Sequence, residues 1–261
     1  MRRPSLTARH VAAQRIGLDR PAGPFGNAAA DVRLQHSVSL GGLVGLGGAG
    51  VPMAARTAFF DRVVASAIDG GVTQVVVLGA GYDGRALRFA HPGVTFFEVD
   101  RAATQADKRR RLRAVAAATT GITFVTADFT RDDLGAALRD RGFDGARPAV
   151  FTCEGLLPYL APADGERLLR AARTAAGEGS TLACNFHVRP PTHALDARLA
   201  RGSVDLLLRV IGERRRTTFR PGDPESLLER AGWHVETVET ADRERGGHAQ
   251  FVVAGVTAPP A

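Results

Sequence analysis

The sequence is poor in lysine: among 261 residues it has only Lys108, although lysine and arginine together number 34. The formal charge of +7 is therefore carried by arginine. A surface that binds a polyanion normally recruits lysine and aromatic side chains as well, and aromatic residues make up only 6% of this chain. We therefore expect no nucleic-acid partner.

Cysteine is scarce too. Cys153 and Cys184 cannot build a disulfide scaffold, and each lies in an apolar run typical of a buried strand, so we expect two reduced core thiols. The first 20 residues carry five arginines and no apolar segment. This pattern predicts no signal peptide and a cytoplasmic location.

One uncharged stretch, 37–55, is long enough to consider as a membrane span. It contains six glycines and Pro52, so its helix propensity and its hydropathy are both low. We interpret it as a loop or lid, and we expect no membrane partner.

The rest of the chain has a globular composition, with 44% apolar and 23% charged residues. From residue 74 onward, short β-branched runs alternate with helical periodicity. This alternation predicts a parallel sheet with helices on both faces. The expected strands are 74–78, 94–99, 122–126, 149–153 and 181–186, and the expected helices are 102–118, 132–140 and 163–176.

The pattern changes near the end of the chain. We expect a helix at 223–231 and two strands at 233–240 and 249–256. The link at 241–248 is too short for a crossover helix, so these two strands should pair antiparallel. Before the first strand, about 70 residues, including an amphipathic helix near 54–69, are predicted to form a cap.

The strongest local motif follows the first strand. Gly79-x-Gly81-x-x-Gly84 lets the backbone turn tightly and approach a ligand, next to the free N–H groups of a helix N-terminus. It matches the dinucleotide fingerprint, with Glu98 and Asp100 about twenty residues further on.

The charges near the strand ends discriminate between two cofactor classes. Carboxylates recur there, and Asp83 would repel a pyrophosphate. S-adenosylmethionine instead brings a sulfonium, an ammonium, ribose hydroxyls and an adenine amine, which all suit carboxylate neighbours. The sequence therefore favours S-adenosylmethionine over a nicotinamide cofactor. The carboxylates are Asp83, Glu98, Asp100, Asp128 and Glu154.

Five motifs in order together resemble the bacterial branch of the leucine carboxyl methyltransferase-like family of class I S-adenosylmethionine-dependent methyltransferases. They lie at 56–61 (RTAFFD), 74–88 (QVVVLGAGYDGRALR), 96–100 (FFEVD), 126–129 (TADF) and 153–160 (CEGLLPYL). The family usually has Asp-Thr-Arg where this chain has Asp83-Gly84-Arg85. The resemblance implies an α/β, Rossmann-like fold with a seven-stranded, mostly parallel sheet, a terminal antiparallel hairpin and an N-terminal helical cap.

It also implies a single domain with four parts. These are a cap and lid at 1–72, a cofactor-binding core at 73–186, an acceptor-side insertion at 187–220, and a terminal helix and hairpin at 221–261.

The resemblance further implies roles for the motif residues. Arg56 would hold the methionine carboxylate of S-adenosylmethionine, whose amino-acid part the glycine backbone would approach. Asp100 would accept from the ribose hydroxyls, and Glu154 would lie near the ammonium. The full expected set is Arg56, Gly79, Ala80, Gly81, Asp83, Arg85, Asp100, Asp128 and Phe129 (which would face the adenine), Glu154 and Gly155, with no metal.

From the family resemblance alone, the expected methyl acceptor is the oxygen of a small acidic or phenolic metabolite, as in secondary metabolism. Methyl transfer mainly requires alignment, and a hydroxyl acceptor also profits from a base. His187, at a strand end, is the candidate base and Tyr159 a second catalytic candidate. Tyr159, Asn185 and Arg189 are candidates to bind the acceptor, and His193 lies nearby.

Other interpretations stay open: a nicotinamide-dependent oxidoreductase, a methyltransferase acting on tRNA or protein, and a methyltransferase fold without methyl transfer. Two basic runs bear on them. Residues 108–113 are interpreted as a solvated helix face. Residues 214–216 could contact an anionic substrate. The oligomeric state is not predicted.

Overall fold

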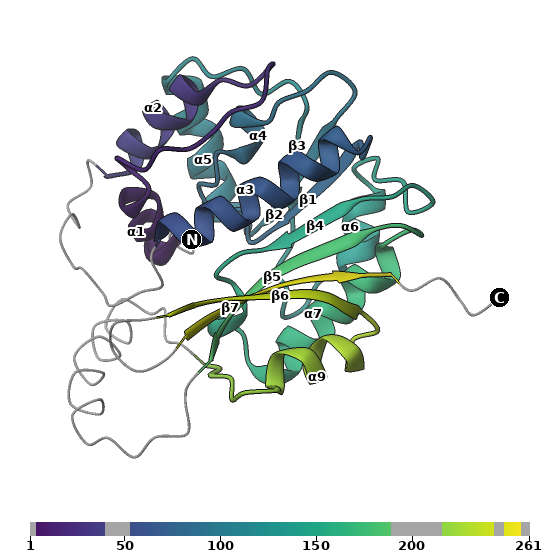
Figure 1. The fold of residues 1–261 in the computed structure, drawn as a ribbon. Coiled ribbons are helices and arrows are strands. Elements are labelled where there is room, and N and C mark those ends of the chain that lie inside the picture. Colours follow the sequence, from purple (N-terminus) through teal and green to yellow (C-terminus); the bar gives the residue numbers. More distant parts are fainter. Residues whose placement is uncertain (1–3, 40–52, 189–215, 243–247, 257–261) are drawn as a thin grey trace, which may run out of the picture.

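The computed structural model describes residues 4–39, 53–188, 216–242 and 248–256 (Figure 1). Most of the predicted glycine-rich lid lies outside these residues. Arg189, His193, Arg214 and Arg215 lie outside them as well.

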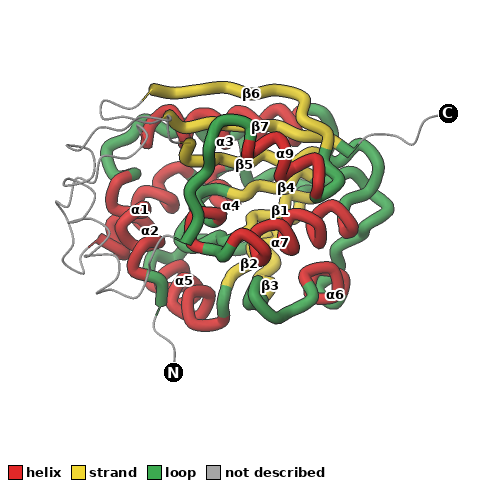
Figure 2. The backbone as a smooth tube through the Cα atoms, turned by 90° about the horizontal axis from the view of Figure 1, so that it is seen from below, coloured by secondary structure: helices red, strands yellow, loops and turns green. Residues whose placement is uncertain are grey.

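Seven strands form one sheet in the order β3-β2-β1-β4-β5-β7-β6 (Figure 2). The first five are parallel, and β7 runs antiparallel to both β5 and β6. The predicted fold class, including the terminal antiparallel hairpin, is confirmed. The strands are β1 (Gln74–Leu78), β2 (Thr95–Asp100), β3 (Ile122–Thr126), β4 (Val150–Cys153), β5 (Thr181–Val188), β6 (His234–Asp242) and β7 (His248–Gly255).

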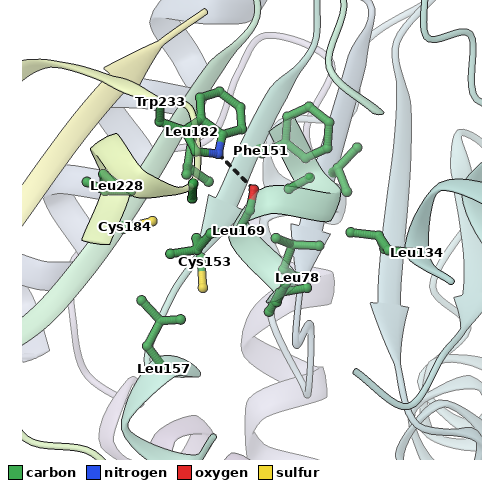
Figure 3. Close-up of a cluster of buried hydrophobic side chains, with 14 of the residues drawn as sticks. Leu78, Leu134, Phe151, Cys153, Leu157, Leu169, Leu182, Cys184, Leu228 and Trp233 are labelled. Atoms are coloured by element: carbon green, nitrogen blue, oxygen red, sulfur yellow. Dashed lines mark hydrogen bonds between the residues drawn. The ribbon is translucent and has the colours of Figure 1, made fainter. Parts of the chain in front are cut away.

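One face of the sheet is covered by α6 (Leu134–Arg139), α7 (Pro162–Ala175) and α9 (Asp223–Arg230). The core here is apolar, and Figure 3 shows its centre. The indole Nε1 of Trp233 donates to the carbonyl oxygen of Leu169 at 2.9 Å, so this large ring is buried without an unpaired donor. Cys153 and Cys184 lie opposite each other on β4 and β5 as free, buried thiols.

The other face carries α3 (Met53–Asp69), α4 (Arg85–Arg88) and α5 (Ala102–Ala114). Two further helices, α1 (Leu6–Gln14) and α2 (Ala28–Ser39), lie beside α4 and α5 near the carboxyl ends of the central strands (Figures 1 and 2). They form the helical part of the expected cap. A short 3-10 helix, η1 (Leu157–Tyr159), follows β4.

The predicted helix 102–118 is too long, because α5 ends at Ala114. Ala116 adopts a φ of 50°, and the N–H of Ala117 donates to the carbonyl of Leu112 at 3.0 Å. This is the six-to-one closure of a Schellman motif, which usually places glycine at the left-handed position. With alanine there, the sequence carries no stop signal.

None of the described helices combines the length and the apolar character that crossing a membrane requires.

Candidate functional site

The glycine loop is held open at the end of β1. Gly79 and Gly81 have φ values of +69° and +49°, a region that favours glycine. The N–H groups of Gly79 and Ala80 both donate to the carbonyl of Val99 on β2, at 2.9 and 3.1 Å. A Cβ added at Gly81 would lie 3.0 Å from the side chain of Ala8, so α1 packs directly on this loop.

Asp100 ties the end of β2 to that loop. Its Oδ2 accepts from the N–H of Gly81 at 2.7 Å, and its Oδ1 accepts from the N–H of Arg101 at 2.6 Å. Burial raises the pKa of Asp100, and the two N–H donors partly oppose that effect. Because each carboxylate oxygen has two acceptor positions, Asp100 keeps capacity for two ligand hydroxyls.

Asp83 begins α4. Its Oδ1 accepts from the N–H of Arg85 at 2.8 Å, and its Oδ2 accepts from Arg85 Nη1 at 2.5 Å. Burial opposes ionisation, but Arg85 and Arg15 outweigh it and hold the pKa of Asp83 well below its usual range. Asp83 is therefore an ionised helix cap whose charge is already matched.

Glu154, directly after β4, is surrounded by three guanidiniums that we name the arginine cluster: Arg15, Arg56 and Arg85. Arg15 Nη2 and Arg56 Nε donate to Oε1 at 2.6 and 2.9 Å, and Arg85 Nη1 donates to Oε2 at 2.6 Å. Burial alone would raise the pKa of Glu154, but these cations lower it to about 2. The structure thus brings together predicted residues from α3, α4 and β4 with one unpredicted residue from α1.

A second layer of ion pairs holds this arrangement. Asp61 of α3 accepts from Arg85 Nε and from both Nη atoms of Arg88, each at 2.7 Å. Arg88 Nε also lies 2.9 Å from Asp31 of α2, which accepts from Arg20 at 2.5 Å. The cap, α3 and α4 therefore meet through matched buried charges.

Lys108 is buried, so the prediction that it lies on a solvated helix face is wrong. Its exposed fraction is 2%. Its Nζ donates to Glu98 Oε2 and to the carbonyl of Asp83, both at 2.6 Å. Within β2, the positive charge of Lys108 therefore balances the negative charge of Glu98. Burial raises the pKa of Glu98. With Asp83, Glu98 and Glu154 all paired to cations, the charge argument for a cationic cofactor rests on Asp100.

Asp128 closes its own turn after β3. It accepts from the Thr130 hydroxyl at 2.7 Å and from Arg131 Nη2 at 3.0 Å. Phe129 follows, half-buried against the apolar core. Both stand at the end of β3, two strands from β1, where a ligand lying along the strand ends would reach them.

The predicted acceptor-side residues lie around the end of β5. Asn185 is buried, and its Oδ1 accepts from the N–H of Gly155, which has a φ of +64°, at 2.7 Å. Asn185 therefore holds the loop after β4. His187 lies two positions further along the same face of β5, and Tyr159 in η1 is half-buried.

Within the described residues, no group of three or more His, Cys, Asp or Glu is arranged to hold a metal ion.

Comparison with known proteins supports the motif reading. Residues 45–173 match the family model of leucine carboxyl methyltransferases. A Mycolicibacterium smegmatis relative is 36% identical over 207 residues, covering 72% of this chain and 62% of its own length. The chain belongs to the leucine carboxyl methyltransferase-like family.

Family members matched here are longer than this chain. A Mycobacterium avium relative is 42% identical over 147 residues, which are 56% of this chain and 48% of the relative. The chain therefore spans about half of that relative and 62% of the other. Both carry a provisional description as S-adenosyl-L-methionine-dependent methyltransferases.

Solved structures show the fold shared by this family member. A magnesium protoporphyrin IX methyltransferase of Synechocystis PCC 6803, solved with bound SAH, superposes with a TM-score of 0.56 at 16% identity. The match covers 87% of this chain and 94% of that one. A DUF574 family protein of Streptomyces avermitilis superposes with a TM-score of 0.57, also at 16% identity, over 78% of this chain and 84% of that one.

This chain departs from the usual family motif at Gly84, and the structure supplies a reason. A Cβ added there would lie 1.8 Å from Oδ1 of Asp31. The fully buried carboxylate of α2 thus occupies the space that a threonine side chain needs.

Several residues that form these buried ion pairs were not predicted from the sequence. Asp61 interrupts the buried stripe of α3 formed by Thr57, Phe60 and Val64, and a charge in an apolar stripe signals a buried partner. The lone lysine of an arginine-rich chain was a similar signal. The missed residues are Arg15, Arg20, Asp31, Asp61, Arg88 and Lys108.

Proposed function

We propose that this chain is an S-adenosylmethionine-dependent methyltransferase that methylates an oxygen of a small acidic or phenolic metabolite. The observation that carries the cofactor assignment is the glycine loop, tied by the Gly81 N–H to a half-buried Asp100 with free acceptor capacity. Family membership supports the same assignment.

The residues present fit this cofactor. Gly79 and Gly81 turn the backbone beside Asp100, whose carboxylate suits the two ribose hydroxyls. Arg56 offers a guanidinium fork for the methionine carboxylate. Among the described residues, its Nη2 donates to the thioether of Met53, a weak acceptor, at 3.1 Å. Asp128 and Phe129, at the end of β3, would face the adenine.

S-adenosylmethionine supplies a methyl carbon activated by its sulfonium when bound. The chain then has to align the acceptor with that carbon and exclude water. His187 would take the proton of a hydroxyl acceptor, whereas a carboxylate acceptor needs no base. Tyr159 and Arg189 would orient the acceptor.

Calorimetric titration with S-adenosylmethionine, S-adenosylhomocysteine and NAD tests the cofactor. We expect micromolar binding of the first two and none of NAD. Binding of NAD alone would restore the oxidoreductase interpretation and end this proposal.

The variant Asp100→Asn tests the site. Loss of charge-assisted hydrogen bonds should weaken cofactor binding by about 1–3 kcal/mol. Asp164→Asn, in an ion pair on the outer helix α7, serves as control and should leave affinity unchanged. Equal affinity of Asp100→Asn and the wild type would remove Asp100 from the site.

The acceptor is tested by screening acidic and phenolic metabolites for methyl transfer and then comparing His187→Gln. A large loss of turnover with intact cofactor affinity indicates a hydroxyl acceptor and a base. Unchanged turnover indicates a carboxylate. Methylation of tRNA or protein but of no small metabolite would overturn the acceptor class.

A further inference from the structure

The N-terminal helix α1 contributes a charge to the centre of the molecule. Arg15 follows the last turn of α1, is 5% exposed, and places Nη2 at 2.6 Å from Glu154 Oε1. No motif pointed to it, and it is separated from Glu154 by 139 positions in the chain. A surface arginine needs no such burial, so its position requires an explanation.

The hydrogen bonding of Arg15 is incomplete. Its Nε is buried and has no hydrogen-bond partner among the described residues. A buried unpaired donor costs about 1–3 kcal/mol, and more when it belongs to a charged group. An acceptor that reached this Nε would recover that cost.

The local charge balance specifies the sign of that acceptor. The arginine cluster contributes three positive charges, and Glu154 and Asp83 contribute two negative ones. Asp61 also contacts Arg85, but it is shared with Arg88. Among the described residues one positive charge therefore remains in excess, so a carboxylate is favoured here.

Glu154 itself is committed to the arginines. Both of its oxygens accept from guanidinium groups, and an approaching ammonium would meet three cations first. Glu154 accepts from Nη2 of Arg15 and from Nε of Arg56, and it leaves the other N–H groups of both guanidiniums without a bond to it. This is the geometry of a residue that orients guanidiniums.

We propose that Arg15 binds the carboxylate end of the cofactor's amino-acid part together with Arg56, and that Glu154 positions both guanidiniums. This inference rests on the proposed cofactor. It makes α1 part of the binding site rather than only a cover, and it assigns Glu154 to the arginines rather than to the ammonium.

Calorimetry with two ligands tests this assignment. S-adenosylhomocysteine carries the amino-acid carboxylate, and 5′-methylthioadenosine has the nucleoside without it. For Arg15→Gln we expect affinity for S-adenosylhomocysteine to fall by about 10- to 100-fold, with affinity for methylthioadenosine unchanged. Arg15→Lys keeps the charge but loses the fork, so its loss should be intermediate.

The control variant is Arg33→Gln, on the exposed surface of α2, which should bind both ligands like the wild type. Thermal unfolding of each variant without ligand checks that the fold is kept; if Arg15→Gln fails to fold, Arg15→Lys supplies the comparison.

Three outcomes overturn the inference. Equal loss of both ligands means that Arg15 supports the whole site, and no loss of either means that it contacts no ligand. In both cases the wild type still binds S-adenosylhomocysteine, so the proposed function stands. Failure of the wild type to bind it overturns the proposed function and this inference together.

Discussion

Two regions of the molecule are stabilised by different physics: the apolar core under one face of the sheet, and the charged side chains around the strand ends. Under α6, α7 and α9, leucine, phenylalanine and Trp233 fill the space between sheet and helices. Around the strand ends beneath α1 to α4, five arginines face four carboxylates in two connected layers. Apolar packing is non-directional and tolerates substitutions of similar volume, whereas a buried ion network fails when one partner is removed.

The comparison indicates what each region is for. Buried charges are weak evidence for stability, since removing them from water costs much of what pairing returns. Apolar packing, under α6, α7 and α9 and also between the sheet and α3 and α4 on the other face, therefore supplies most of the folding free energy. The ionic region keeps charged groups in fixed positions where a charged ligand can meet them.

Lowering the pH should destabilise the ionic region and leave the apolar core unaffected, which is the largest difference that we expect between them. The pKa values of Glu154 and of Asp107, a buried residue of α5 that accepts from Arg111, are lowered to about 2, and the pKa of Asp83 is lowered as well. A carboxyl with a depressed folded-state pKa stabilises the fold above its unfolded value near 4 and loses that contribution as pH falls toward 2. Glu98 and Asp100, whose pKa values are raised, act in the opposite direction, but they are two groups against three.

We therefore expect the free energy of unfolding to fall between pH 5 and pH 3, measured by urea titration at each pH. The apolar face does not titrate, so Leu228→Ala should cost the same at both pH values. Stability that is constant between pH 5 and pH 3 contradicts the assignment.

Removing the central cation should be the most damaging single substitution. Arg85 is 1% exposed and contacts Asp61, Asp83 and Glu154. Arg85→Met should destabilise the fold by about 3–5 kcal/mol, because a buried carboxylate loses its partner. The matched control is Arg62→Gln, in an exposed pair with Glu239, which should cost at most about 1 kcal/mol. Equal costs in urea unfolding would erase the distinction.

The apolar face should respond to volume rather than to identity. Leu228 of α9 is fully buried. Leu228→Ala should cost about 2–5 kcal/mol through lost packing and a cavity. Leu228→Met, of similar volume, should cost less than about 1.5 kcal/mol. Chemical denaturation of both variants measures the difference. A large loss of stability in Leu228→Met would mean that the apolar core tolerates substitution no better than the ionic region does.

Gly84 offers a smaller test of how tightly α2 meets the site. Gly84→Ala places a methyl group against the buried Asp31 carboxylate and should cost about 1–3 kcal/mol. Gly165→Ala, within α7, meets only Leu157 at 3.6 Å and should be neutral or stabilising by up to about 1 kcal/mol. Thermal unfolding compares the two, and a neutral Gly84→Ala would show that α2 can move away.

The sequence was most informative where local patterns determine structure. A parallel strand buried on both faces appears as an apolar run, which is why β1 was placed with its observed bounds. The β-branched run of β3 located that strand equally well, although most of it is half-buried. The helix stop at Ala114 was missed because alanine took a position that normally signals itself with glycine.

The candidate site divides in the same way. Motif residues such as Asp100 and Glu154 were identified from their positions after strands. The partners Arg15, Asp31 and Lys108 were not, because their roles depend on contacts between distant segments, such as the 139 positions that separate Arg15 from Glu154. Charge pairing across the fold leaves no periodic trace in a sequence.

The burial of Lys108 has a practical consequence for labelling. The only lysine side chain of the sequence is closed off between α5 and β2, with its ammonium bonded to Glu98 and to the glycine loop. An acylating reagent needs a free, unprotonated amine, so its attachment to Lys108 requires α5 to separate from the sheet. The rate of that single modification therefore measures how fast the glycine loop opens, and it is detected as one mass increase on the peptide that contains Lys108.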